Sequence, residues 1–209
     1  MNEAEARRWL SESLGVSRET EERIAEFGAL LRRENERQNL VSAATLDHFW
    51  VRHVMDSAQL LLLGDTSGPW LDLGTGAGFP GLIVAALRAE PVTLVESRRL
   101  RVEFLHRAVA ILGAAPEIVH ASIERVPDRP FAVISARAFA PLPRLLALAH
   151  RFSTEKTLWL LPKGRGAKSE LEAISDAWQG DFRLEPSLTD ADASIIVATR
   201  VRRRPGRSK

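Results

Sequence analysis

The chain has 209 residues, with 29 lysines and arginines, 27 aspartates and glutamates, and no cysteine. The missing cysteines exclude disulfides, thiolate metal sites, iron–sulfur clusters and cysteine nucleophiles. A chain of this length buries enough apolar surface to fold as one domain without them. The formal net charge of +2 is uneven, because residues 200–209 hold six basic residues and no acid. The remainder has 23 basic and 27 acidic residues.

No part of the sequence predicts a membrane or export segment. The longest apolar runs are far shorter than the ~20 residues that span a bilayer, and the first ten residues mix acids with arginines. We therefore expect a cytoplasmic protein. We also expect it to be a monomer. We divide it into an N-terminal helical extension (1–67), a core (68–201) and a flexible basic tail (202–209).

The first part of the chain is predicted to be helical. Residues 3–14 form a short amphipathic segment, and residues 19–37 place apolar side chains every three to four positions. Ser17 can cap the second helix, and the acids that follow it suit the positive end of the helix dipole. A third helix with an apolar face is predicted over residues 46–63.

After Gly68 short apolar strands alternate with helices. Strands are predicted over residues 70–73, 92–96, 117–120, 132–135 and 157–161, and helices over 80–89, 98–112, 142–152 and 168–178. This alternation is typical of a parallel sheet covered on both faces. The last two strands, 182–188 and 194–201, are too close for a crossover and should form an antiparallel hairpin. The predicted fold is a doubly wound, Rossmann-like α/β sheet, mostly parallel and preceded by helices.

The segment WLDLGTGAGFPG, residues 70–81, joins the first of these strands to the next helix. Its glycines allow a tight turn and a close approach of the backbone to a ligand. Ligands of doubly wound sheets bind beside this turn. Glu96 ends the next strand, 22 residues after Gly74, where a carboxylate can accept hydrogen bonds from two ribose hydroxyls.

Two cofactors fit this loop. A G-x-G-x-x-G spacing at Gly76, Gly78 and Gly81 is that of a dinucleotide site, whereas the register that starts at Asp72 indicates S-adenosylmethionine. We favour S-adenosylmethionine, because the dinucleotide register begins late after the strand. The Asp72 carboxylate also suits an ammonium or a water better than a pyrophosphate. A glycine turn that binds nothing is the third interpretation.

Four segments occur along the chain in this order: NLVSAATLDHFWVRHVMDS, LDLGTGAGFPG, ISARAFAPL and LLPKGRG. Together they resemble the small-subunit ribosomal RNA guanine-N7 methyltransferase family (RsmG, also called glucose-inhibited division protein B), over about residues 23–201. The most specific pieces are GTGAGFPG, R-H-x-x-D-S at residues 52–57 and R-A-F-A at residues 137–140. This chain reads S-A-R-A-F-A where the family commonly has S-R-A-F-A, so we align the segment on Arg137.

The resemblance implies a class I methyltransferase that transfers a methyl group from S-adenosylmethionine to N7 of a guanine in 16S rRNA, guanine 527 in ribosomal numbering. It implies an rRNA acceptor within a small ribosomal subunit or its precursor, and no metal. The cofactor-binding residues carried over by position are Gly74, Gly76, Phe79, Glu96, Ile123, Glu124 and Arg137. The residues expected to contact the acceptor RNA are Arg52, His53, Arg137 and Lys163.

The residue types present in the sequence also bear on which atom of the RNA accepts the methyl group. Methylation of pyrimidine C5 generally needs a cysteine, and methylation of an exocyclic amine usually shows an N/D-P-P-Y/F motif, which residues 135–141 do not match. Ribose methylation would use a basic relay around a lysine, and Lys163 has no evident companions for it. Guanine N7 carries a lone pair and no proton, so in-line positioning is sufficient and we assign no general base.

Three other functions stay open on the sequence alone. A small-molecule methyltransferase would use the same fold with another acceptor. A non-catalytic RNA-binding module would keep the fold without methyl transfer. A nicotinamide-dependent dehydrogenase would use the dinucleotide spacing of the glycine loop.

Overall fold

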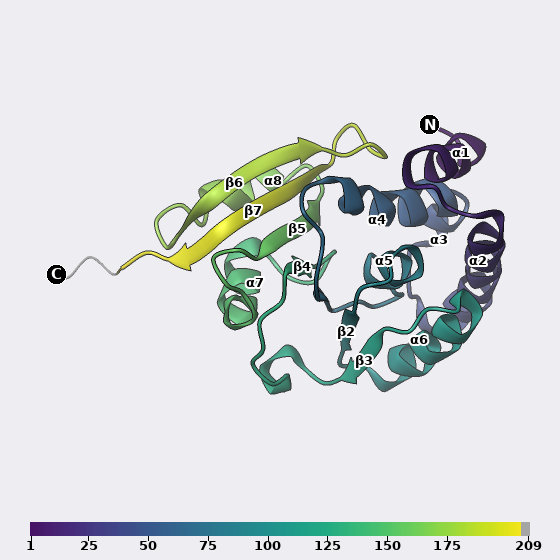
Figure 1. The fold of residues 1–209 in the computed structure, drawn as a ribbon, viewed down its shortest axis with the longest axis horizontal. Coiled ribbons are helices and arrows are strands. Elements are labelled where there is room, and N and C mark those ends of the chain that lie inside the picture. Colours follow the sequence, from purple (N-terminus) through teal and green to yellow (C-terminus); the bar gives the residue numbers. More distant parts are fainter. Residues whose placement is uncertain (206–209) are drawn as a thin grey trace.

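The computed structural model describes residues 1–205. Its centre is a seven-stranded sheet, whose strands are drawn as arrows in Figure 1. The strands are β1 (Trp70–Leu73), β2 (Val92–Glu96), β3 (Glu117–His120), β4 (Val133–Ser135), β5 (Leu158–Lys163), β6 (Trp178–Pro186) and β7 (Ser194–Arg203). They lie in the order β3-β2-β1-β4-β5-β7-β6. The first five strands pair in parallel, and β7 runs antiparallel to both β5 and β6. The predicted parallel sheet with an antiparallel C-terminal hairpin is therefore confirmed.

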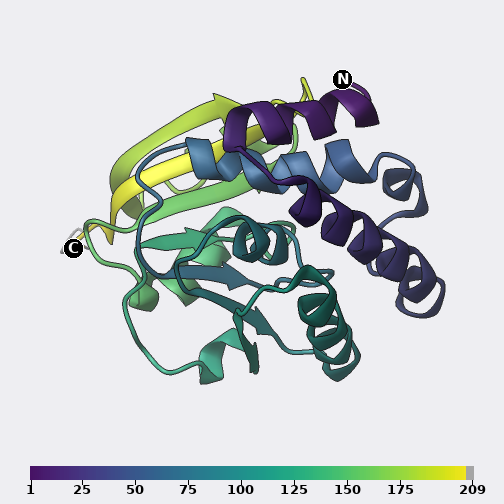
Figure 2. The same ribbon diagram turned by 45° about the vertical axis from the view of Figure 1, so that its right-hand side comes forward.

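Helices cover both faces of this sheet. The α-helices are α1 (Glu3–Leu14), α2 (Arg18–Gln38), α3 (Ala43–Leu46), α4 (Asp56–Ala58), α5 (Gly81–Leu87), α6 (Arg99–Leu112), α7 (Leu142–Ala149) and α8 (Ala167–Glu172). One apolar core joins α1, α2, α5 and α6 to the first face, and a second joins α7 and α8 to the other. Figure 2 brings the N-terminal helices forward, where α1 and α2 lie outside the sheet on the same side as α6.

Local signals explain where several helices begin and end. Ser17 caps α2, and its Oγ accepts a hydrogen bond from the backbone N–H of Thr20 at 3.1 Å. Gly113 ends α6 with a φ of +63°, a left-handed conformation that glycine adopts without strain. Apolar periodicity and capping residues in the sequence therefore predicted these elements well.

The helix predicted over residues 46–63 is present from residue 49 to residue 62, but it is not a uniform α-helix. After α3 the chain forms a π-helix, η1 (Trp50–Met55), then α4, and then a 3₁₀ turn, η2 (Gln59–Leu62). The Glu3 carboxylate of α1 accepts hydrogen bonds from the backbone N–H groups of Trp50 and Val51, at 2.9 and 3.0 Å. The first helix thereby satisfies donors at the start of η1, a contact that the local apolar pattern cannot reveal.

The C-terminal boundaries also differ from the prediction. The helix predicted over 168–178 ends at Glu172, because Trp178 instead begins β6 and pairs with Arg203. Strand β7 therefore includes Arg202 and Arg203, the first two residues of the predicted basic tail, whereas residues 206–209 lie outside the described part. Within residues 1–205, no helix is long and apolar enough to span a membrane.

Candidate functional site

Two cavities open at the carboxyl ends of the parallel strands. The large cleft has a volume of about 1040 Å³ and is lined by the glycine loop, by residues 40–56, by the loop after β4 and by the β6–β7 turn. The small pocket, of about 260 Å³, lies where β2 and β3 end. The two cavities share the lining residues Gly74, Phe139 and Ala140. A ligand longer than one cavity could therefore extend from the small pocket into the large cleft.

The loop between β1 and α5 needs glycine at two positions that line these cavities. Gly74 and Gly76 have φ values of +63° and +57°, which residues with a side chain rarely adopt. A Cβ atom at Gly74 would lie 2.3 Å from Cδ2 of Phe139, whereas at Gly76 it would meet no atom closer than 3.7 Å. The loop backbone is therefore in direct contact with Phe139 on one side and open to the cleft on the other.

Asp72 holds this loop from inside the protein. Its side chain is fully buried and accepts hydrogen bonds from Ser135 Oγ at 2.6 Å, from the N–H of Gly81 at 3.1 Å and from the Thr75 hydroxyl. Burial raises the pKa of Asp72 to about 6, although these three hydrogen bonds favour the ionised form. The expectation that Asp72 accepts a hydrogen bond from an ammonium or a water is wrong. Protein groups already donate to its oxygens, and its side chain is not accessible from the cleft.

The small pocket brings together four of the residues predicted to bind a cofactor, namely Gly74, Glu96, Ile123 and Glu124. Glu96 is 4% exposed, and its oxygens accept from the backbone N–H groups of Gly76 at 3.1 Å and Arg98 at 2.8 Å. Ile123 and Glu124, from the 3₁₀ turn η3 (Ile123–Arg125), line the same pocket. Because an ionised carboxylate accepts about four hydrogen bonds, Glu96 keeps acceptor capacity for ligand hydroxyls.

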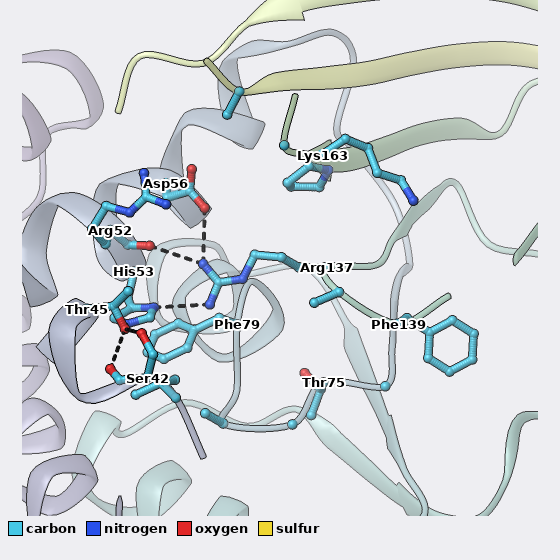
Figure 3. A pocket seen from close by; sticks show the side chains of 18 of the residues that line it. Ser42, Thr45, Arg52, His53, Asp56, Thr75, Phe79, Arg137, Phe139 and Lys163 are labelled. Atoms are coloured by element: carbon cyan, nitrogen blue, oxygen red, sulfur yellow. Dashed lines mark hydrogen bonds and ion pairs between the residues drawn. The ribbon is translucent and has the colours of Figure 1, made fainter. Parts of the chain in front are cut away.

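Arg137 follows β4 and lies in the large cleft instead of the small pocket. Its Nη1 donates to Asp56 Oδ2 at 3.1 Å and to the carbonyl of Arg52 at 3.2 Å, and its Nη2 donates to His53 Nδ1 at 3.1 Å. The guanidinium also lies 5.0 Å from the ring centre of Phe79. Figure 3 shows Arg137 directed toward this group, whereas Phe139 and Lys163 point elsewhere. The motif at residues 52–57 therefore fixes the guanidinium of Arg137.

His53 is a buried, neutral member of this group. Burial, and then the positive charges of Arg137 and Arg52, lower the pKa of His53 to about 3. Its Nε2 lies 3.0 Å from Thr45 Oγ1, and its ring stacks on Phe79 with the centroids 4.7 Å apart. Both ring nitrogens are therefore engaged, and the imidazole serves as a wall of the cleft.

The β6–β7 turn contributes residues that the sequence did not indicate. Thr189 Oγ1 donates to Asp56 Oδ1 at 2.8 Å, and Arg52 pairs with Asp190 at 2.7 Å. The sequence predicted only a hairpin here, and these partners lie more than 130 positions from the motif they complete. No local signal could have found them.

Lys163 lies on the opposite side of the large cleft from His53. Its Nζ donates to the carbonyl of Ala140 at 3.2 Å and pairs with Glu170 at 2.8 Å. Glu170 was also missed by the sequence interpretation. Of the four predicted acceptor contacts, the structure brings Arg52, His53 and Arg137 together and places Lys163 apart from them.

Comparison with known proteins gives consistent matches along the chain. The GidB family model, described as rRNA small subunit methyltransferase G, matches residues 20–191. A protein of Rhizorhabdus wittichii named ribosomal RNA small subunit methyltransferase G is 51% identical, with 98% of this chain and 95% of the relative covered. One of the same name from Novosphingobium aromaticivorans is 52% identical over 94% of this chain and 88% of its own.

Solved structures agree at the level of the fold. An O-methyltransferase from Bacillus cereus, in complex with SAH, superposes with a TM-score of 0.61 at 15% identity and covers 92% of this chain and 96% of its own. A variant of MtNAS in complex with S-adenosylmethionine gives a TM-score of 0.57 at 17% identity, over 84% of this chain and 74% of that one. The fold is that of class I methyltransferases, and the resemblance found in the sequence is confirmed. The chain belongs to the GidB family, rRNA small subunit methyltransferase G.

Proposed function

We propose that the protein is an S-adenosylmethionine-dependent methyltransferase that methylates N7 of a guanine in small-subunit rRNA. By family resemblance the acceptor is guanine 527 of 16S rRNA in ribosomal numbering. The observation that carries the proposal is the junction at Gly74 and Phe139, where a nucleoside-sized pocket meets a larger cleft. Membership of the rRNA small subunit methyltransferase G family supports the rRNA acceptor.

The residues of the small pocket fit the nucleoside part of the cofactor. Glu96 has the free acceptor capacity that two ribose hydroxyls require, and Ile123 offers an apolar wall for a flat base. Gly74 and Gly76 keep the loop free of side chains where the remainder of the cofactor would lie. The bound cofactor supplies a methyl group activated by the positive charge on sulfur.

The chemistry of the large cleft suits an acceptor that has no proton to lose. His53 is neutral with both nitrogens engaged, and the oxygens of Asp56 accept from Arg137, Gln59 and Thr189. These groups are poorly placed to remove a proton, and the lone pair of guanine N7 requires no such step. Holding the acceptor in line with the methyl group is then the main task of the protein.

We further propose that the acceptor lies in the large cleft against Arg52, His53 and Arg137, which line it together with Lys163. N7 is on the Hoogsteen edge, which the deep groove of duplex RNA hides, so the target guanine should be in a loop or splayed out of a helix. We expect the protein to act as a cytoplasmic monomer on a small ribosomal subunit or its precursor. In this proposal residues 1–67 form an extension that supplies one wall of the cleft.

The test has two stages. Calorimetry with S-adenosylhomocysteine should give stoichiometric binding, and absence of binding would contradict the cofactor assignment. Isolated small subunits and deproteinised rRNA from a strain that lacks the gene are then methylated and compared. Borohydride–aniline cleavage followed by primer extension should place 7-methylguanosine at a single position. Methyl transfer to another atom, or only to small molecules, would overturn the acceptor assignment.

A further inference from the structure

The loop Arg137–Pro141 is fixed at both ends by groups from other elements. At its start Arg137 is hydrogen-bonded to the 52–56 segment. At its end Lys163 Nζ donates to the carbonyl of Ala140 at 3.2 Å, and Glu170 Oε2 accepts from the N–H of Leu142 at 2.6 Å. Lys163 and Glu170 are themselves joined at 2.8 Å. We call this second anchor the Lys163–Glu170 clamp.

The clamp joins two charged side chains that come from different elements. Lys163 ends β5, Glu170 lies in α8, and their side chains are only 12% and 28% exposed. The N–H of Leu142 opens α7 and has no partner within that helix, so a carboxylate is favoured there. Both bonds to the loop are charge-assisted, and such bonds are stronger than those between neutral groups.

The segment between the two anchors separates the two cavities. Ala138, the residue before Phe139, has a φ of +52°, a conformation that non-glycine residues seldom adopt. Phe139 contacts the backbone at Gly74, and both Phe139 and Ala140 line the small pocket as well as the large cleft. A shift of Ala140 would therefore move the boundary between the two cavities.

We propose that Lys163 and Glu170 are positioning residues that fix the Arg137–Pro141 loop between the cofactor pocket and the acceptor cleft. Lys163 then acts through Ala140 and Glu170, and it is not a contact for an RNA phosphate. The inference rests on the proposed function, because it assigns the two cavities to cofactor and acceptor. The competing role for Lys163, a phosphate contact, makes opposite predictions for the two variants below.

The test compares Lys163→Gln, Glu170→Gln and the double variant in the full-length protein. Glu170→Gln is nearly isosteric and can still accept from Leu142, so it removes the ion pair with little risk to folding. Lys168→Gln and Glu172→Gln are the matched controls, since both residues are exposed and their side chains make no bond among residues 1–205. Lys163→Arg, which keeps the charge and the donors, should restore most of the wild-type behaviour.

The first readout is amide hydrogen exchange in the protein without cofactor. Peptides that contain residues 138–142 should exchange about tenfold faster in both single variants and at wild-type rates in the controls. The affinity for S-adenosylhomocysteine should fall about tenfold in each single variant, with the double variant no worse than the weaker single one. The KM for isolated small subunits should change by less than about twofold, because Lys163 has no direct contact with RNA.

Several results would contradict the proposed role of the Lys163–Glu170 clamp. Wild-type exchange in both single variants would show that the ion pair does not hold the loop. If Lys163 contacted a phosphate, only Lys163→Gln would raise the KM for small subunits, and the salt dependence of its RNA affinity would have a slope lower by about one. Glu170→Gln, which frees the ammonium of Lys163, would then bind RNA as well as or better than wild type. A wild-type protein that transfers no methyl group would contradict the proposed function, whereas the exchange measurement still decides whether the clamp exists.

Discussion

Arg137 donates a hydrogen bond to Nδ1 of His53 at 3.1 Å, which sets the protonation of the imidazole. A guanidinium can only donate, so Nδ1 accepts and the proton of the neutral ring lies on Nε2, which donates to Thr45. A second proton on the ring would face Arg137 directly. The two residues lie 84 positions apart, yet each fixes the orientation of the other.

The first prediction concerns the pH dependence of stability. The pKa of His53 is lowered to about 3 in the folded protein, below the ordinary value of 6.5. As the pH falls below 6.5 the unfolded chain takes up a proton that the folded protein refuses until near pH 3, so stability is lost across this window. The slope from one such group reaches about 1.4 kcal/mol per pH unit.

Urea unfolding at pH 7, 6 and 5 measures this contribution. His53→Gln should lose less free energy of unfolding between pH 7 and pH 5 than wild type, by about 1–2 kcal/mol. His106→Gln, at an exposed position, should keep the wild-type slope. Identical slopes in wild type and His53→Gln would contradict a buried neutral imidazole.

The second prediction concerns the guanidinium of Arg137. Arg137→Lys keeps the charge but cannot make three directed bonds to Asp56, His53 and the Arg52 carbonyl at once. We expect kcat/KM for methylation of small subunits to fall about 100-fold, because a displacement of about 1 Å can have that effect. Arg18→Lys, at an exposed ion pair far from the cleft, is the control. A loss below about twofold would refute a directional role for this residue.

The third prediction uses two glycines with the same backbone conformation. Gly15 and Gly74 both have a φ of +63°, but a Cβ at Gly15 meets nothing within 4 Å, whereas one at Gly74 would lie 2.3 Å from Phe139. Alanine at either position should cost about 1–2 kcal/mol of stability through the left-handed backbone. Only Gly74→Ala should also weaken binding of S-adenosylhomocysteine, by about tenfold or more. Equal calorimetric affinities in the two variants would mean that the contact with Phe139 does not matter.

The fourth prediction concerns a buried hydrogen-bond chain beneath the glycine loop. Trp70 Nε1 donates to Ser135 Oγ at 2.8 Å, and Ser135 Oγ donates to Asp72 at 2.6 Å. Ser135→Ala leaves the indole N–H without this partner and removes a donor from the carboxylate, so we expect a loss of about 2–3 kcal/mol in chemical denaturation. Ser175→Ala, at an exposed turn, should change stability by less than about 0.5 kcal/mol. Comparable losses of stability in both variants would argue against a stabilising role for these buried hydrogen bonds.

Much of the fold could be predicted because its signals are local. The strand–helix alternation after Gly68 and the cap at Ser17 both depend on neighbours within a few positions. The hairpin followed from the short link between its strands. The π-helix η1 could not be predicted, because its first donors are satisfied by Glu3, 47 positions away.

In the candidate site, too, the features with local signals could be predicted and those that depend on distant residues could not. The sequence indicated the glycine loop and Glu96, since their spacing within one βαβ unit is nearly fixed. Asp72 was misjudged, because a strand pattern does not reveal which neighbours occupy a buried carboxylate. Asp190 and Glu170 were missed, since each reaches the cleft through pairing of distant strands or packing of a short helix.

The position of β7 between β5 and β6 has a consequence for synthesis of the protein. The small pocket has its last lining residue at Leu148, whereas the large cleft takes lining residues up to Ile195. Since a chain is made from its N-terminus, the two cavities are completed in sequence. The residues that line the small pocket are therefore all made before the last wall of the large cleft. The apolar core beneath Ile123 also includes Trp159 and Ile196, so termination before β7 would remove part of that core together with the cleft wall.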